Sequence, residues 1–325
     1  MPGPRFRVAL VAGAVSAVVL LAACGGGTNE TSSSDLGATV RIGGTQAYVP
    51  TLPAFYGAKA GIFEEHGVEA EVMNFEGGGA SMEALAAGEV DLINYLPAGL
   101  AQAVQGEVEA KVVAAGSEVP QGWWLTALTD SGYETVADLD GADIGVSAAG
   151  ATTDLYAQYV IEQAGVSANF VPVGGSGMIP ALTEGNVDAI LAFPPQGYEL
   201  ENQHEIVILA DLAEEPALRH PDVWIASKEL IEERPEVLED TLAAFYESVQ
   251  ILQGDRQLAV DQIVELAGYP DETAERAYED TIMALSTNGE FTMDSIATAM
   301  DLSAESDALP PVEDIATTDF VPIAQ

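Results

Sequence analysis

The feature that most constrains this chain is an internal repeat. The segment from Gly77 to Ile93 matches the segment from Gly174 to Ile190 at an offset of 97 residues, with eight of 17 positions identical and no gap. Both copies contain a glycine turn, an Ala-Leu pair and a Gly-x-Val-Asp sequence ahead of an apolar run. Because a repeat reports a repeated structural unit, the chain is expected to contain two similar halves.

Each half has the same predicted order of elements. A strand comes first, followed by a helix, a second strand, a helix opened by the glycine turn, and a third strand after the Gly-x-Val-Asp sequence. The predicted elements are 39–43, 52–66, 70–75, 81–87 and 92–96 in the first half, and 143–146, 152–164, 169–173, 178–184 and 189–193 in the second. Strands that alternate with helices indicate βαβ units and parallel sheets. The predicted fold class is α/β, with two Rossmann-like lobes and a ligand cleft outside the carboxyl ends of the strands.

The two lobes are not expected to be simply sequential. Apolar strands predicted at 124–129 and 223–227 flank the second half and would form a two-strand hinge. We therefore predict that residues 39–126 and 222–325 form lobe 1 and that residues 127–221 form lobe 2. Beyond the hinge, helices are predicted over 229–233, 235–253, 256–266, 272–286 and 293–301, followed by an extended tail over 302–325.

The N-terminal residues are typical of an export signal. Arg5 and Arg7 precede an apolar run of 16 residues from Val8, which is short of the roughly 20 that a spanning helix needs. The sequence Leu-Ala-Ala-Cys at its end resembles the bacterial lipoprotein box, which implies cleavage before Cys24 and lipidation of that cysteine. We expect a signal peptide over 1–23, a flexible tether over 24–38, and a mature protein anchored to the outer face of the cytoplasmic membrane.

The composition excludes several classes of protein. With 52 acidic and 10 basic side chains, the formal charge of -42 would repel a nucleic-acid backbone. The single cysteine excludes an internal disulfide and a cysteine-based zinc cluster, and no metal site is expected. Acidic surfaces keep proteins solvated at high salt, so a halophilic or salt-tolerant source is favoured over a cation-binding role.

Several stretches, taken in order, resemble one family. They are Arg41-Ile42-Gly43, Leu52-Pro53-Ala54-Phe55-Tyr56, the run from Ala60 to Val68, the run from Gly77 to Asp91, Leu96-Pro97-Ala98, the run from Val136 to Gly141, the run from Gly150 to Leu155, and the run from Trp224 to Glu229. Over roughly residues 39 to 325 they resemble the solute-binding proteins of ABC importers for nitrate, sulfonate, taurine and thiamine-pyrimidine precursors. The resemblance implies a type II periplasmic-binding-protein fold and a monomer without a cofactor, which closes around one small ligand and delivers it to the permease and ATPase subunits.

The candidate ligand-binding residues share a place in loops that follow predicted strands. They are Gln46, Tyr48, Glu76, Gly78, Pro97, Ala98, Ser117, Glu118, Trp123, Trp124, Ser147, Thr152, Thr153, Gly175 and Phe193. Thr152 and Thr153 begin a predicted helix, where free N–H groups and the helix dipole favour an anion, although such hydroxyls also serve as plain N-caps. The glycine turns lack the Lys-Ser/Thr of a P-loop and are predicted to be tight turns, some of which line the cleft.

The aromatic and acidic candidates allow two interpretations. Trp123 and Trp124 are adjacent, so on a strand they face opposite ways and one of them is expected in the core. Tyr95 is a further aromatic candidate. Glu76 and Glu118 are either acceptors for a ligand N–H or solvated surface acids.

Three functional hypotheses remain open on the sequence. No basic residue is clearly aimed at the cleft, so an anion would depend on helix N-termini and hydroxyls, whereas a neutral heteroaromatic such as a thiamine pyrimidine precursor would suit the aromatics and Glu118. A sensor lipoprotein without a transport role is the alternative of another class. An enzyme is disfavoured. Thiamine-pyrimidine synthases share the fold that the resemblance implies, but they use a cysteine-rich iron motif and an active-site histidine, whereas the single cysteine of this chain, Cys24, lies in the lipoprotein box. His66, His204 and His220 also lack the spacing of a metal site.

Overall fold

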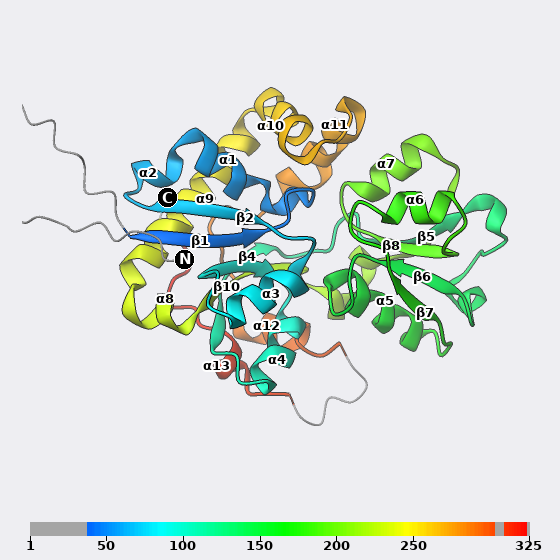
Figure 1. Ribbon diagram of the computed structural model, residues 1–325, viewed down its shortest axis with the longest axis horizontal. Coiled ribbons are helices and arrows are strands. Elements are labelled where there is room, and N and C mark those ends of the chain that lie inside the picture. Colours follow the sequence, from blue (N-terminus) through cyan, green and yellow to red (C-terminus); the bar gives the residue numbers. More distant parts are fainter. Residues whose placement is uncertain (1–37, 303–308, 324–325) are drawn as a thin grey trace, which may run out of the picture. The chain divides into compact units, whose positions relative to one another are not determined.

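The computed structural model describes residues 38–302 and 309–323 (Figure 1). The predicted signal peptide, almost all of the predicted tether and Cys24 lie outside the described residues. Within the described part of the chain, no helix is both long and apolar enough to cross a membrane.

The first sheet has the strand order β2-β1-β3-β10-β4. Its strands are β1 (Thr39–Gly44), β2 (Glu69–Asn74), β3 (Leu92–Tyr95), β4 (Ala110–Ser117) and β10 (Asp222–Ser227). β1 pairs in parallel with β2 and β3, while β10 runs antiparallel to β3 and β4. Four strands therefore run in one direction, and the prediction of a parallel sheet is wrong for β10 alone, because β10 enters directly from the other half rather than through a crossover helix.

The second sheet repeats this pattern with the order β7-β6-β8-β5-β9. Its strands are β5 (Trp124–Leu128), β6 (Asp143–Val146), β7 (Asn169–Pro172), β8 (Ala189–Ala192) and β9 (Ile206–Asp211). β6 pairs in parallel with β7 and β8, and β5 runs antiparallel to β8 and β9. In each sheet, the strand that arrives from the other half is the antiparallel one.

The chain passes between the sheets twice. The first crossing is residues 118–123, between β4 and β5, and the second is residues 212–221, between β9 and β10. β5 and β10 are thus full members of the sheets, not connections between them, and the boundary predicted between residues 126 and 127 falls inside β5. The segments that join the two halves are the crossings themselves.

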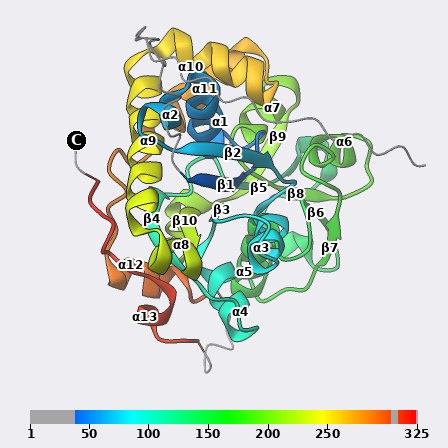
Figure 2. The ribbon, with the colours of Figure 1, turned by 60° about the vertical axis from the view of Figure 1, so that its left-hand side comes forward.

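The helices cover the sheets (Figures 1 and 2). They are α1 (Leu52–Ala60), α2 (Ile62–Glu65), α3 (Gly78–Ala86), α4 (Pro97–Gln105), α5 (Thr152–Gln163), α6 (Met178–Thr183), α7 (Gln196–Gln203), α8 (Lys228–Glu233), α9 (Pro235–Gly254), α10 (Arg256–Gln262), α11 (Asp271–Asp280), α12 (Met293–Ala299) and α13 (Val312–Ile315). α9, yellow in Figure 2, packs against α1 and α2 beside the first sheet.

Several predicted elements differ from the structure. The helix predicted over 272–286 ends at Asp280 and is followed by a 3-10 turn over Ile282–Ala284. The helix predicted over 52–66 divides into α1 and α2 because Gly61 adopts a left-handed conformation with a φ of 80°. The tail predicted to be extended contains α13, and Ala316 forms a parallel bridge with Val112 of β4. The end of the chain is therefore tied to the edge of the first sheet.

Candidate functional site

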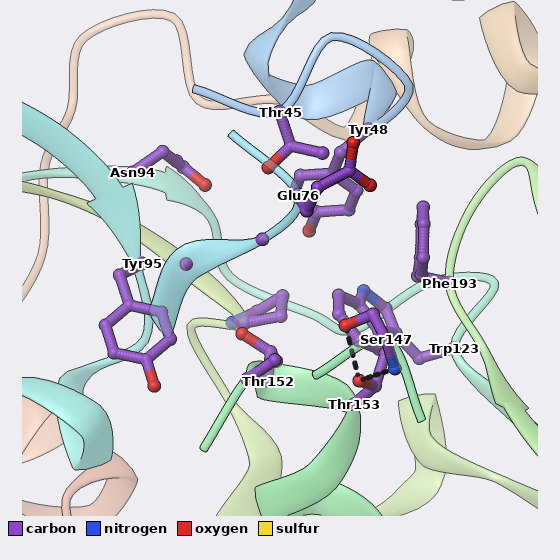
Figure 3. Close-up of a pocket in the computed structure, with 14 residues that line it drawn as sticks. Thr45, Tyr48, Glu76, Asn94, Tyr95, Trp123, Ser147, Thr152, Thr153 and Phe193 are labelled. Atoms are coloured by element: carbon purple, nitrogen blue, oxygen red, sulfur yellow. Dashed lines mark hydrogen bonds between the residues drawn. The ribbon is translucent and has the colours of Figure 1, made fainter. Parts of the chain in front are cut away.

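A cavity lies where the ends of strands from both sheets meet the starts of two helices (Figure 3). Its volume is about 40 Å³, which is room for about three water molecules or one small chemical group. The residues that line it are Thr45, Tyr48, Glu76, Gly77, Gly78, Asn94, Tyr95, Trp123, Ser147, Ala151, Thr152, Thr153, Phe193 and Pro221. Each crossing contributes one residue, Trp123 from the first and Pro221 from the second, so the cavity is built around the connections between the two halves.

The start of α5 forms one wall. The hydroxyl of Thr153 accepts a hydrogen bond from the Ser147 N–H at 2.9 Å and lies 2.8 Å from the Ser147 hydroxyl. The Gly150 N–H donates to Asp154 Oδ2 at 2.7 Å. These bonds fix the loop 147–151, and among the described residues no hydrogen-bond partner is assigned to the Thr152 hydroxyl. The first turn of a helix also leaves backbone N–H groups without intrahelical partners, so this wall offers donors and a partial positive charge.

The start of α3 forms the facing wall. A Cβ atom on Gly77 would lie 3.6 Å from Ser147 Oγ and 3.7 Å from the Ala151 Cβ, so the two helix starts approach each other across the cavity. Both helices direct their positive ends toward the same space. Among the described residues that line the cavity there is no Lys, Arg or His, and Glu76 is the only charged side chain. The groups in the cavity wall that favour an anion are therefore backbone N–H groups and hydroxyls, and the Glu76 carboxylate opposes them.

Aromatic rings close another side of the cavity. The ring centroids of Tyr48 and Trp123 are 5.6 Å apart, those of Tyr48 and Phe193 are 5.8 Å apart, and those of Trp123 and Phe193 are 6.0 Å apart. Trp123 also packs edge-to-face on Tyr156 of α5 at 5.4 Å. The site thus combines an apolar surface with polar donors a short distance away, which is typical of small-molecule sites.

Comparison with known proteins places this chain in a family. The model of NMT1/THI5-like proteins matches residues 50–257. The chain belongs to the NMT1/THI5-like family. A protein of Brucella abortus (strain 2308), named as a candidate binding protein, is 27% identical over 227 residues, which are 68% of this chain and 69% of the relative.

Solved structures agree with this NMT1/THI5-like fold. The alkanesulfonate-binding protein SsuA from Xanthomonas axonopodis pv. citri, bound to MOPS, superposes with a TM-score of 0.75 at 18% identity, over 86% of this chain and 98% of SsuA. The periplasmic nitrate-binding protein NrtA from Synechocystis PCC 6803 gives a TM-score of 0.70 at 12% identity, over 87% of each chain. The chain has the periplasmic-binding-protein fold, so the family and fold inferred from its sequence are confirmed.

The structure divides the candidate residues of this NMT1/THI5-like protein into two groups. Eight line the cavity: Tyr48, Glu76, Gly78, Trp123, Ser147, Thr152, Thr153 and Phe193. Seven do not: Gln46, Pro97, Ala98, Ser117, Glu118, Trp124 and Gly175. The role of all fifteen residues as ligand contacts remains a prediction.

The residues of the second group lie in other environments. Trp124 packs on Tyr198 of α7 at 5.4 Å, and Arg276 of α11 stacks over both rings. Glu118 is exposed and pairs with Arg219 at 3.3 Å. Pro97 and Ala98 are buried in the first turn of α4, the Gln46 N–H donates to Asn74 at 2.8 Å, and Gly175 lies beside Phe193 just outside the cavity.

Six lining residues are not among the fifteen candidates: Tyr95 and Gly77, expected only as an aromatic candidate and as part of a glycine turn, Thr45 and Ala151, which lie in loops expected at the cleft, and Asn94 and Pro221, which the sequence did not indicate. Thr45, Asn94, Ala151 and Pro221 complete the wall. Asn94 is 7% exposed within the otherwise apolar β3. A polar side chain in a buried strand was the signal that could have found it.

A buried carboxyl group lies behind the cavity wall. Asp222, at the start of β10, is fully buried and accepts hydrogen bonds from the Ser117 hydroxyl and, at 3.4 Å, from the Tyr48 hydroxyl. Burial raises the pKa of Asp222 to about 6, against the opposing effect of the hydrogen bond from Ser117. Ser117, whose contact with a ligand stays a prediction, joins the end of β4 to the start of β10 through this bond.

Proposed function

We propose that this chain is an extracytoplasmic solute-binding protein of an ABC importer that captures a small anion carrying an apolar group. The observation that carries the proposal is the convergence of the starts of α3 and α5 on a cavity with an aromatic wall. Backbone donors at helix starts bind oxyanions without a cationic side chain, and the rings would hold the apolar part of the ligand. The alkanesulfonate and nitrate binding named for the neighbouring structures is in keeping with this chemistry.

Capture requires movement of the two halves. A cavity of about 40 Å³ is smaller than the several hundred cubic ångströms of typical ligand sites. We propose that the chain moves as two lobes, one formed by residues 39–126 and 222–325 and the other by residues 127–221. The boundary at residue 126 is moved to the start of β5, so that the whole of β5 belongs to the second lobe. Rotation of the lobes about the two crossings would open the site. Ligand binding would then stabilise the closed arrangement.

The proposed setting follows from the N-terminal sequence. Cleavage before Cys24 and its lipidation would anchor the protein to the outer face of the cytoplasmic membrane, where it would meet the permease as a monomer. Metabolic labelling with a clickable palmitate analogue should mark the full-length chain and leave the Cys24→Ser variant unlabelled. Equal labelling of both would contradict the lipid anchor.

A thermal-shift screen tests the ligand class. The chain from residue 25 onward would be mixed, in high salt, with hexane-1-sulfonate, taurine, nitrate or an aminopyrimidine. A ligand at 100 times its Kd adds about 2.7 kcal/mol to the free energy of unfolding. We expect a shift with an anion, and none with the aminopyrimidine.

Matched variants locate the binding site. Thr152→Val keeps the side-chain shape and removes the free hydroxyl, so it should raise the Kd of the anion about tenfold or more. Thr298→Val removes an exposed threonine hydroxyl in α12, away from the cavity, and should leave the Kd unchanged. Equal Kd values for both variants would contradict anion binding at α5.

A neutral heteroaromatic is the second candidate ligand. Glu76 lines the cavity and could accept a ligand N–H, while Trp123 and Phe193 could stack on a ring. A shift with the aminopyrimidine alone would replace the anion by this class. A protein that binds solute but supports no uptake into vesicles containing the permease would indicate a sensor instead.

A further inference from the structure

Tyr95 occupies a slot that two glycines create. It ends β3, and its ring lies between Gly78, the first residue of α3, and Gly99 of α4. A Cβ atom on Gly78 would lie 1.9 Å from the ring, and one on Gly99 would lie 2.0 Å from it. Neither glycine has a left-handed φ. Glycine is therefore needed at both positions because a side chain would collide with the ring, not because of the backbone conformation. The ring is 4% exposed and is fixed in direction.

The fixed ring aims its hydroxyl at the other half of the molecule. The Tyr95 hydroxyl donates a hydrogen bond to the Gly150 carbonyl, in the loop between β6 and α5. A Cβ atom on Gly79 would lie 3.5 Å from the same carbonyl oxygen, so the start of α3 also borders this loop. Because Thr152 and Thr153 follow Gly150 after one intervening residue, the hydrogen bond connects the first sheet to the segment that presents the start of α5.

The second half handles the equivalent position differently. At the offset of 97 residues, Tyr95 corresponds to Ala192 and Gly99 corresponds to Gln196, while Pro97 matches Pro194. Gln196 Nε2 donates to the carbonyl of Gly175, the counterpart of Gly78, at 2.6 Å. The hydrogen bond of Gln196 thus stays within the second half, whereas the hydrogen bond of Tyr95 links the first half to the second. The repeated fold does not require Tyr95.

We propose that Tyr95 is a latch, a positioning residue whose hydroxyl bond to Gly150 forms when the halves close and slows release of the ligand. This inference rests on the proposed binding function and adds a residue that controls how long the closed form lasts. The glycine slot orders the ring before closure, so little side-chain entropy is lost when the bond forms. A neutral hydrogen bond of this kind corresponds to about a 2- to 10-fold effect on the dissociation rate.

The decisive measurement is amide hydrogen exchange without ligand. Tyr95→Phe removes the hydroxyl and keeps the ring in its slot, so peptides covering residues 147–156 should exchange faster. The matched control is Tyr278→Phe, since the Tyr278 hydroxyl also donates to a backbone carbonyl, that of Gln253 at 2.8 Å, away from the cavity. Unchanged exchange over 147–156 in Tyr95→Phe would overturn the proposal, as would faster exchange confined to β3 and α4.

A second variant separates the latch from a local packing effect. Gly99→Ala should push the ring out of its slot and accelerate exchange over 147–156 as well. If both changes act through one hydrogen bond, the double variant with Tyr95→Phe should show no more than the larger single effect. Additive effects would contradict a shared latch.

Ligand kinetics provide the last readout. Stopped-flow tryptophan fluorescence with hexane-1-sulfonate should show a 2- to 10-fold higher dissociation rate for Tyr95→Phe, with association unchanged within about twofold and Tyr278→Phe equal to the wild type. An unchanged dissociation rate would overturn the proposal. If the wild type binds no sulfonate, the proposed ligand class fails, whereas the exchange experiment still decides the latch.

Discussion

The two Gly-x-Val-Asp sequences show which parts of the repeat are required by the fold. In the first half the Arg41 N–H donates to Asp91 at 2.9 Å, and the Asp91 N–H returns a bond to the Arg41 carbonyl at 2.8 Å. In the second half Asp143 and Asp188 make the same two bonds at 2.9 and 2.8 Å. The aspartate therefore joins β1 to β3 in the first sheet and β6 to β8 in the second by two bonds to the backbone of its partner, whatever the side chain of that partner.

The side chains around these aspartates differ. Asp91 forms ion pairs with Arg41 at 2.7 Å and with Arg234 at 3.2 Å. Asp188 faces Asp143, and no ion pair joins it to a described cation. In the first half, ion pairs add to the backbone hydrogen bonds of the aspartate, whereas in the second half the backbone hydrogen bonds lack such ion pairs among the described residues. The same sequence motif therefore need not contribute equally to stability in the two halves.

The largest expected difference between the two halves is in the stability lost when each aspartate is replaced by asparagine. Asp91→Asn leaves Arg41 and Arg234 without their partner and should lower the free energy of unfolding by about 2–3 kcal/mol, given that both arginines are partly exposed. Asp188→Asn should cost about 1 kcal/mol or less. Urea unfolding at pH 7.5 measures both, and equal losses would show that the arginines add nothing.

The pH dependence of the first variant has a defined sign. Burial disfavours ionisation of Asp91, but the hydrogen bonds and charge of Arg41, with Arg234, hold its pKa below the usual value. Its stabilising effect is present above the pKa of the unfolded chain and is lost as the pH falls through the lowered folded pKa. The difference in the free energy of unfolding between the wild type and Asp91→Asn should therefore disappear only at acidic pH.

The strands that enter each sheet from the other half provide a second contrast. β10 begins with the buried Asp222, whereas β5 begins with Trp124. Because the folded pKa of Asp222 is about 6, above that of the unfolded chain, its ionisation destabilises the fold as the pH rises from about 4 to 6. Asp222→Asn should thus be more stable than the wild type by about 1–2 kcal/mol at pH 7.5 and no more stable at pH 4. Urea titrations at both values test this, and a difference independent of pH would contradict it.

The smallest effects should be equal in the two halves. Gly88 and Gly185 occupy matching positions, with φ values of 71° and 72°, and nothing lies within 4 Å of a Cβ placed on either. Alanine there introduces backbone strain without a steric clash, so each substitution should cost about 1 kcal/mol. Thermal unfolding measures the two losses, and clearly unequal values would break the equivalence of the halves.

The sequence was most informative where local patterns decide structure. Strand β6 was predicted with its observed bounds, and most other elements of the two halves differ by one to three residues at either end, because apolar runs and glycine turns define them. The direction of β5 and β10 could not be read from the sequence, since it depends on where the crossings deliver the chain. The division at Gly61 could not be predicted, because the sequence does not show whether a glycine continues a helix or ends it in a left-handed conformation.

The cavity was accessible to prediction in part. Loops after parallel strands led to Tyr48, Ser147 and Thr152, because carboxyl ends of strands share one edge of a sheet. The same reasoning could not choose between Trp123 and Trp124, since adjacency in sequence says only that they face opposite ways. That choice depends on the crossing, which ends at Trp123 and places the next residue against α7.

The placement of β10 has a consequence for the order in which the molecule is assembled. All strands of the second sheet lie in one continuous stretch, 124–211, so that sheet is complete as soon as this stretch is available. The first sheet begins earlier in the chain but has β10 between β3 and β4, and must wait for residues 222–227. As the chain emerges with its N-terminus first, whether from a ribosome or through a membrane pore, the half that starts second is the half that can finish first.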